Sequence, residues 1–430
     1  MNIGAIARKV YFAFLLTLVC GFSPFSRSQT YSVLHNFSGG ADGANPYAGI
    51  TLGQAGSLLG TASGGGLGYG TVFKLKSSQS GNTLGVLYSF TGGSDGANPY
   101  NGVVVGSDGI VYGSTYSAGG GGCGGYGCGT VFNLRPPATL CRSILCPWTE
   151  TSLHGFVGGN DGSGPTQGSN LIFDQMGNMY GTTVSGGAYG QGTVYKLTRS
   201  AGGWTESVIH AFGASGDGAQ PLHNVILDTS GNLYGTTSYG GAYNKGTVYQ
   251  LVPSGSGWTE NILVSFSLSE SAGGIPYAGL LIDQSGNLYG ATSANASSGG
   301  PPTGYGGGGA IFELIPSSGG WTLKVLYNFP DLGEGYHCGP YGNLVMDTAG
   351  NLYGITYSDG PYGYGSVFKL TPASGQWTYT SLHDFCSDGW PCAEGALPSG
   401  DLTMDANGNF YGTTSLGGSN NYGLVWKITP

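Results

Sequence analysis

Aspartates in the recurring motif D-G-x-x-P are the first residues of this chain whose type and spacing could do chemistry. The four copies begin at Asp42, Asp95, Asp161 and Asp217. Carboxylates that gather in space bind hard cations such as Ca²⁺, whereas an isolated Asp-Gly pair makes a tight turn. Both interpretations stay open. Apart from this Ca²⁺ hypothesis, no cofactor is predicted.

Tyrosines form a second recurring set, in loops that are rich in Gly and Asn. The set comprises Tyr69, Tyr126, Tyr189, Tyr243, Tyr305, Tyr364 and Tyr422. Four further tyrosines directly follow recurring prolines, at Tyr47, Tyr100, Tyr277 and Tyr341. A rigid aromatic ring with a polar tip suits sugar or peptide surfaces. The alternative is packing between repeats, and we expect the first set to be the more exposed.

Histidines fall into two groups. His35, His154, His210 and His383 share one repeat position, which Tyr88, Val264 and Tyr327 occupy elsewhere. A position that accepts Val indicates strand packing, so no metal ring is predicted there. His223 and His337 break the repeat and lie in loops, which makes them the two histidines to test for ligand binding.

Signals of catalysis are few. The sequence contains no G-x-S-x-G elbow, H-E-x-x-H pair or P-loop. The nearest asymmetric set lies towards the C-terminus and comprises Glu334, His337, Asp384, Asp388 and Glu394. Two acids at a suitable separation could cleave a glycoside. We predict no enzyme, and a polysaccharide hydrolase or lyase is the alternative.

The elements that must position these residues recur seven times. Leu233–Thr237 and Gly246–Leu251 are β-type runs joined by a tyrosine-containing loop, and both runs have six relatives. A third run resembles Tyr31–Phe37 and ends in Phe each time. A fourth, short apolar run follows each of the prolines Pro46, Pro99, Pro165, Pro221, Pro276, Pro340 and Pro398. In five repeats the turn D-x-x-G-N follows that run.

Four strands per repeat predict an all-β, seven-bladed β-propeller of antiparallel blades over residues 29–430. Tyr31–Phe37 is expected to pair with Val425–Ile428 and so to close the ring. We name the loops that end in Pro the proline loops, and the tyrosine-containing loops the tyrosine loops. Because successive strands alternate in direction, both kinds are expected on one face of the disc, which we name the loop face. Because the strand after each Pro is innermost, the D-G-x-x-P carboxylates are expected near the mouth of the central tunnel.

The repeated G-N-L-Y-G-T-T, followed by G-G and G-x-G-T-V-F-x-L, resembles the GloVer tandem repeat of secreted bacterial proteins. The resemblance covers nearly all of residues 31–430. It implies secretion and a propeller-like fold, and it supplies no catalytic residues. The first two repeats depart from it, with Gly53 and Gly106 at the position of the turn Asp.

Residues 1–28 have the pattern of a secretory signal peptide, with Arg8 and Lys9 before an apolar run. Removing them would leave ten basic and 22 acidic residues, a net charge of −12, because Arg8, Lys9 and Arg27 are lost from the 13 basic residues. Export would permit disulfides. The local pairs are Cys123–Cys128, Cys141–Cys146 and Cys386–Cys392, which leaves Cys338 odd.

These observations predict a secreted, periplasmic or cell-surface binding protein whose ligand is a glycan or an extracellular protein. A structural envelope component without a specific ligand is the alternative from another class. The acidic balance argues against nucleic acid. The apolar run of the leader is too short to predict a membrane span in the mature chain, and we expect a monomer.

Overall fold

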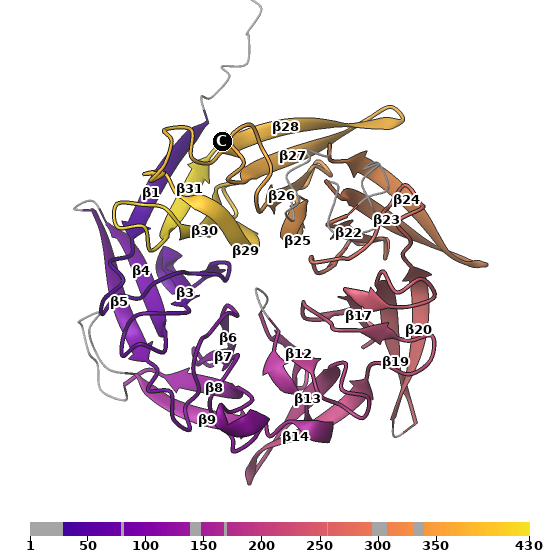
Figure 1. The fold of residues 1–430 in the computed structure, drawn as a ribbon, viewed down its shortest axis with the longest axis horizontal. Coiled ribbons are helices and arrows are strands. Elements are labelled where there is room, and N and C mark those ends of the chain that lie inside the picture. The colour runs from indigo at the N-terminus through magenta and orange to yellow at the C-terminus, as the bar shows by residue number, and fades with distance from the viewer. Residues whose placement is uncertain are drawn as a thin grey trace, which may run out of the picture.

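The computed structural model describes residues 29–78, 81–137, 148–166, 170–255, 257–294, 308–330 and 339–430. These residues form an all-β ring of seven antiparallel, four-stranded blades that follow one another around a central axis (Figure 1). The predicted seven-bladed propeller is therefore confirmed. Among the described residues, no helix is long and apolar enough to span a membrane.

Within each blade the strands succeed one another from the innermost to the outermost. Blade 1 consists of β2 (Thr51–Leu52), β3 (Leu58–Ala62), β4 (Thr71–Ser78) and β5 (Gly81–Ser89), and blade 2 of β6 (Val104–Val105), β7 (Val111–Thr115), β8 (Thr130–Arg135) and β9 (Thr149–Gly155). Blade 3 consists of β11 (Ile172–Phe173), β12 (Met179–Ser185), β13 (Thr193–Ser200) and β14 (Gly203–Ala211), blade 4 of β16 (Ile226–Leu227), β17 (Leu233–Thr237), β19 (Thr247–Ser254) and β20 (Gly257–Ser265), and blade 5 of β21 (Leu281–Ile282), β22 (Leu288–Thr292), β23 (Ala310–Ser317) and β24 (Gly320–Asn328). Blade 6 consists of β25 (Pro340–Met346), β26 (Leu352–Thr356), β27 (Ser366–Ala373) and β28 (Gln376–Asp384), and blade 7 of β29 (Ala396–Met404), β30 (Phe410–Leu416), β31 (Leu424–Thr429) and β1 (Thr30–Asn36). Short additional pieces are β10 (Ser163–Pro165), β15 (Gly218–Ala219), β18 (Tyr239–Gly240) and the 3-10 turns η1 (Gln54–Gly56), η2 (Cys123–Gly125) and η3 (Gly159–Asp161).

Blade 7 combines the two ends of the described chain. β1 pairs antiparallel with β31, with Thr30 opposite Thr429 and Asn36 opposite Leu424. The predicted closure is thus confirmed, and it covers the edge that β31 would otherwise expose.

A β-bulge recurs where the third strand of each blade meets the fourth. In blade 3 the register shifts between Val194 and Tyr195, and the same shift occurs at the equivalent place in all seven sheets. The residue left over on the fourth strand is a Leu or Ile, and the next residue is the His, Tyr or Val of the repeat. A bulge re-aims neighbouring side chains, so this one determines where the histidines point.

Aromatic pairs join each blade to the next. The Phe that ends a fourth strand packs on the aromatic residue of the next blade's third strand, as in Phe37–Phe73 at 5.3 Å and Phe212–Tyr249 at 4.9 Å between ring centroids. The same pair closes the ring at Phe385–Trp426, 5.8 Å apart. Each pair adds about 0.5–1.5 kcal/mol beyond simple burial. The core consists of clusters of buried residues at the junctions between successive blades.

The inner strands differ from the prediction. Pro340 starts β25 and Pro398 lies in β29, but the inner strands of blades 1 to 5 have two residues and begin several residues after their prolines. The chain after Pro46 instead lies against the neighbouring blade, since a Cβ on Gly49 would come within 2.3 Å of the Asp401 carbonyl oxygen. Backbone contact between blades thus replaces sheet pairing there.

The five D-x-x-G-N turns form as predicted, on the face opposite the loop face. In blade 4, Asp228 Oδ1 accepts the backbone N–H groups of Ser230 and Asn232 at 2.8 and 2.9 Å. Its Oδ2 accepts hydrogen bonds from Asn232 Nδ2 and from the Tyr234 hydroxyl. In blade 1 the turn keeps its backbone hydrogen bond, from Gly53 to Ser57, without a carboxylate. In blade 2 the backbone bond runs from Gly106 to Ile110, and Asp108 supplies a carboxylate from another position by accepting the Ile110 N–H at 3.1 Å.

Candidate functional site

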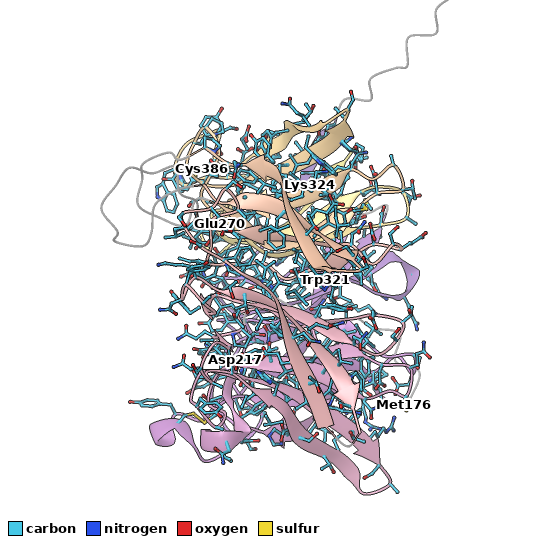
Figure 2. All side chains as sticks on the ribbon, turned by 90° about the vertical axis from the view of Figure 1, so that its right-hand side faces the viewer. Met176, Asp217, Glu270, Trp321, Lys324 and Cys386 are labelled. Carbon is cyan, nitrogen blue, oxygen red and sulfur yellow. A yellow bond between two sulfur atoms is a disulfide. The ribbon has the colours of Figure 1, made fainter. Side chains whose placement is uncertain are left out.

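The two faces of the disc carry different side chains. Seen edge-on, Met176 lies on one face, while Glu270 and Cys386 lie towards the other, which is the loop face (Figure 2). Met176 belongs to a short turn between the first two strands of blade 3. The loop face carries the longer loops, in which the candidate residues lie.

The tyrosine loops present exposed rings on this face. Five of the predicted tyrosines are among the most exposed large apolar side chains of the described residues, with exposed fractions of 43% to 85%: Tyr69, Tyr126, Tyr189, Tyr243 and Tyr422. Tyr364 is half-buried and stacks on Trp390, with 6.1 Å between ring centroids. Tyr305 lies outside the described residues.

Glycines of the proline loops support these rings. A Cβ on Gly39 would lie 2.5 Å from the ring of Tyr422, and one on Gly92 would lie 2.5 Å from that of Tyr69. Each of these rings therefore rests on a glycine of the next blade, and its other side is open. Close approach of this kind requires the missing side chain.

The residue before the proline ties the two kinds of loop together. The backbone N–H of Asn45 donates to the Tyr422 carbonyl, and that of Asn98 donates to the Tyr69 carbonyl, both at 2.9 Å. Asn45, Asn98 and Ile275 adopt φ values of 51° to 59°, a left-handed conformation that is rare before proline and strained for Ile. The tyrosine loops are thereby fixed at the blade junctions.

A pocket of about 620 Å³ lies on the loop face between blades 3 and 4. It is lined by residues of the proline loop 213–220, Asp217 among them, and by Gln191, Tyr239 and Asn244. Tyr189 lies at one side, since its Cβ is 2.9 Å from a Cβ built on the lining residue Gly213. Tyr243 directly precedes Asn244 at the other side. The pocket is thus polar, and two exposed tyrosines adjoin its lining residues without being among them.

The D-G-x-x-P aspartates do not lie at the tunnel mouth, so that expectation is wrong. Each carboxylate instead contacts the outermost strand of the preceding blade: Asp42 lies 3.0 Å from His35, Asp95 accepts a 3.0 Å hydrogen bond from Tyr88, Asp161 lies 3.0 Å from His154, and Asp217 lies 3.2 Å from His210. Each also accepts backbone N–H groups of its own loop, as Asp95 does from Thr91 and Gly93. Each D-G-x-x-P motif follows the outer strand of a blade, and these hydrogen bonds keep the carboxylate of its Asp beside that strand and away from the tunnel.

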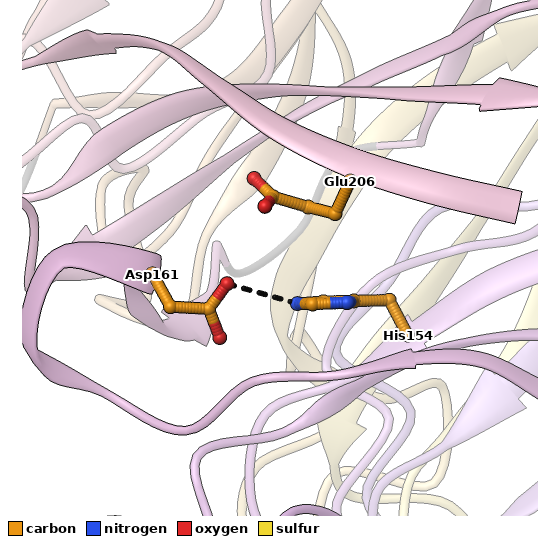
Figure 3. Close-up of side chains that lie close together, drawn as sticks. All are labelled: His154, Asp161 and Glu206. Atoms are coloured by element: carbon orange, nitrogen blue, oxygen red, sulfur yellow. Dashed lines mark hydrogen bonds and ion pairs between the residues drawn. The ribbon is translucent and has the colours of Figure 1, made fainter.

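Two of these pairs acquire a third side chain from the next blade. His154 and Asp161 lie beside Glu206 of β14 (Figure 3), and His210 and Asp217 lie beside Glu260 of β20. In each group one ligand atom per residue lies within 4.8 Å of the others. The packing expected for these histidines is also present, as His154 contacts Phe156 with 4.7 Å between ring centroids.

Burial and the charge of the aspartate act on these glutamates. Burial and then Asp161 raise the pKa of Glu206 to about 7, and burial and then Asp217 raise that of Glu260 to about 8. Glu150, beside Asp95 in the preceding junction, has its pKa raised to about 7 by the same two causes. The sequence interpretation missed all three glutamates. They share the signal W-T-E, but the partner carboxylate comes from another repeat.

His223 is almost fully buried in the inner segment of blade 4, and burial lowers its pKa to about 4. It lies 6.4 Å from Tyr341, one of several half-buried tyrosines of the inner segments. Tyr47 contacts Tyr100, and Tyr100 contacts Tyr116 edge to face, with centroids 5.4 and 5.5 Å apart. These tyrosines pack on one another, unlike those of the tyrosine loops. His337 lies outside the described residues.

The acids of blades 6 and 7 that could form a catalytic group accept hydrogen bonds from their own strand or loop, and Glu394 also lies 3.9 Å from His383. Asp384 accepts from Ser381, Asp388 from the Ala393 N–H, and Glu394 from the Ser387 N–H. Glu334 lies outside the described residues.

Disulfides join Cys123 to Cys128 and Cys386 to Cys392, as predicted. Cys123 is exposed, whereas Cys386 and Cys392 are buried in a small cluster with Ala396. Cys141, Cys146 and Cys338 lie outside the described residues.

Several solved structures align with the chain at low identity. A gluconolactonase from Xanthomonas campestris is 13% identical, with 93% of this chain and 88% of that chain covered and a TM-score of 0.41. A putative glucose dehydrogenase from Thermus thermophilus is 13% identical, covers 94% and 100%, and has a TM-score of 0.45. A protein from Lactobacillus plantarum is 14% identical, covers 86% and 88%, and has a TM-score of 0.44. At such values these likenesses carry no argument about activity.

No curated protein matches the chain. The model of the Gloeobacter/Verrucomicrobia repeat matches residues 125–337 and 297–430, which together span more than half of the sequence. The repeated strands and loops described above account for this match, and the chain belongs to the Gloeobacter/Verrucomicrobia repeat family.

Proposed function

We propose that this propeller binds a neutral polysaccharide on its loop face, with the pocket between blades 3 and 4 as the principal site. The observation that carries the proposal is the position of Tyr189 and Tyr243, which are 58% and 57% exposed. Each is adjacent to a lining residue of the polar pocket, Tyr189 to Gly213 in space and Tyr243 to Asn244 in sequence. Tyrosine supplies rigid, amphipathic contact area at a low cost in conformational entropy. The C–H face of a sugar ring packs on such a ring, while its hydroxyls need hydrogen bonds.

The pocket supports both kinds of contact. Its lining combines the amide residues Gln191, Gln220 and Asn244 with Asp217, Tyr239 and residues of a glycine-rich loop. Amides donate and accept hydrogen bonds and so match hydroxyl groups. Only 8% of the residues of the whole chain are charged, and the net charge is −9. Such a surface disfavours acidic polymers, so a neutral glycan fits best.

Exposed tyrosines at the same position in other blades extend this surface. Tyr69, Tyr126 and Tyr422 would offer further contacts to a long chain, and linked contacts raise the apparent affinity without any one of them being strong. The two disulfides suit an oxidising compartment, so we infer that the protein acts outside the cytoplasm, where polysaccharides are found.

Affinity electrophoresis in gels that contain soluble xylan, mannan or β-glucan tests the proposal. The variant Tyr189→Ala/Tyr243→Ala should lose at least about tenfold in affinity, some 1.4 kcal/mol, for a glycan that retards the wild type. The matched control is Met176→Ala, because Met176 is 81% exposed on the opposite face. Equal retardation of the double variant and the wild type, or no retardation of the wild type in any gel and no signal on a glycan array, would contradict the proposal.

A further inference from the structure

We propose that the junctions between blades 2 and 3 and between blades 3 and 4 each bind a divalent transition-metal ion. The ligands at the first are His154 Nε2 and the carboxylates of Asp161 and Glu206. Those at the second are His210 Nε2 and the carboxylates of Asp217 and Glu260. Zn²⁺ is the ion for which we argue. The proposal is independent of carbohydrate binding.

The spacing of the donor atoms fits a small ion. Two ligands about 2.0–2.2 Å from Zn²⁺ in tetrahedral geometry lie roughly 3.3–3.6 Å apart. His154 Nε2 lies 3.0 Å from Asp161 Oδ1, and His210 Nε2 lies 3.2 Å from Asp217 Oδ2 and 3.6 Å from Glu260 Oε1. The other donor atoms of each group lie within 4.8 Å of one another, so the side chains must move towards a shared ion to complete either site.

Three separate elements supply the donors of each site, as Figure 3 shows for the first. The bulge on β9 precedes His154, the proline loop carries Asp161, and β14 of the next blade brings Glu206 above them. An ion held there would join two blades. An Asp that only formed a local turn would not need a glutamate from the next blade beside it.

An independent observation concerns the glutamates. Oε1 of Glu206 and Oε1 of Glu260 are buried atoms that accept no hydrogen bond from a donor of the described residues, and each glutamate lies against the carboxyl group of the neighbouring aspartate. A buried carboxylate oxygen without a partner costs free energy. A metal ion would satisfy that oxygen and would also offset the repulsion between the two carboxylates of each site.

The donor set selects the kind of ion. Zn²⁺ accepts imidazole nitrogen and carboxylate oxygen as ligands, and with three protein ligands its fourth position can stay open to water. Ca²⁺ instead takes six to eight oxygen ligands, and each site offers a nitrogen and two carboxylates. Asp217 also lines the loop-face pocket, so the second site lies at the edge of that pocket.

Two other junctions of the described ring each lack one ligand and serve as internal controls. Beside His35 and Asp42, the position equivalent to Glu206 is occupied by Leu84. The two positions are equivalent because Leu84 pairs with Leu75 in blade 1 and Glu206 pairs with Leu197 in blade 3. Asp95 and Glu150 have Tyr88 at the place of the histidine. We therefore expect two ions per chain rather than seven.

Zinc content of the whole chain tests the proposal. Protein stripped with EDTA, loaded with Zn²⁺ and passed through a desalting column should retain about two equivalents by mass spectrometry of the metal, one for each of the two groups. His154→Tyr should retain one equivalent, and His154→Tyr/His210→Tyr none. His35→Tyr, the matched control, should retain two. Tyrosine is chosen because Tyr88 occupies this position beside a carboxylate pair within the native fold.

Thermal unfolding is a second measurement, which keeps the proposal testable if the tyrosine variants fold poorly. Zn²⁺ should raise the melting temperature of the wild type, and it should have no effect on Glu206→Gln/Glu260→Gln, which keeps the shape of both side chains without their charge. Retention of zinc by the double tyrosine variant, loss of zinc in His35→Tyr, or no retained zinc in the wild type would each overturn the proposal.

Discussion

The ring of Tyr31 lies flat on the imidazole of His383, with 3.9 Å between ring centroids and an angle of 6° between ring planes. Tyr31 belongs to the first strand of the described chain and His383 to the outer strand of blade 6. The Tyr31 hydroxyl also donates to the Glu394 carbonyl at 2.6 Å. The N-terminal strand is therefore held by the preceding blade as well as by the sheet that it completes.

Tyr31→Ala should lower the free energy of unfolding by about 2 kcal/mol, because the ring contacts with His383 and Trp426 are lost. Tyr31→Phe keeps the stacked ring and loses the hydrogen bond, so it should cost about 1 kcal/mol. Urea unfolding followed by tryptophan fluorescence measures both. Equal loss in the two variants would show that the stacking adds nothing to closure.

Glu150→Gln should raise stability at pH 8 more than at pH 5. Burial and then Asp95 raise the pKa of Glu150 from 4.5 to about 7, so the folded state holds this proton more tightly than the unfolded chain. The stabilisation is complete below pH 4.5 and is lost as the pH rises through 7. Gln stays neutral and avoids that loss. Melting temperatures at both pH values, with exposed Glu270→Gln as control, test this. The same change at both pH values would contradict it.

Asp228→Ala should destabilise blade 4 by about 1–2 kcal/mol, because four donors of the turn lose their acceptor. Asp228→Asn should fall between this variant and the wild type, since one acceptor oxygen remains. Ser230→Ala changes an exposed residue of the same turn and should leave the unfolding midpoint unaltered. If Asp228→Ala also leaves it unaltered, the backbone alone holds the turn, as it does at Gly53.

The two disulfides should react differently with a reducing agent under native conditions. Cys123 is exposed and Cys128 is buried beside it, whereas Cys386 and Cys392 are both buried. Peptide mapping after mild reduction and alkylation should find Cys123–Cys128 open first. Replacing Cys386 and Cys392 together by Ala should lower the free energy of unfolding by about 2 kcal/mol, as expected for a short loop. Simultaneous opening of both bonds would contradict the difference in access.

The sequence predicted the blades, because each blade is one repeat and a repeat shows its strands through its own alternation and turns. It predicted neither the direction of the D-G-x-x-P carboxylates nor the role of Glu150, Glu206 and Glu260. Those depend on the bulge that turns the neighbouring histidine or tyrosine, and on contact between successive repeats. Nor did local pattern indicate the left-handed backbone at Ile275, since β-branched residues before proline normally avoid it.

The position of Thr30 opposite Thr429 has a consequence for the order of the blades. One blade is divided between the two ends of the chain, while the packing between blades repeats around the ring. A short linker from residue 430 to residue 29, with a new opening at exposed Gly202 between β13 and β14, would move that division from blade 7 to blade 3. Circular permutation should then preserve the fold. The choice of the blade that carries the termini would therefore depend on where the coding sequence begins, and not on the packing that holds the ring together.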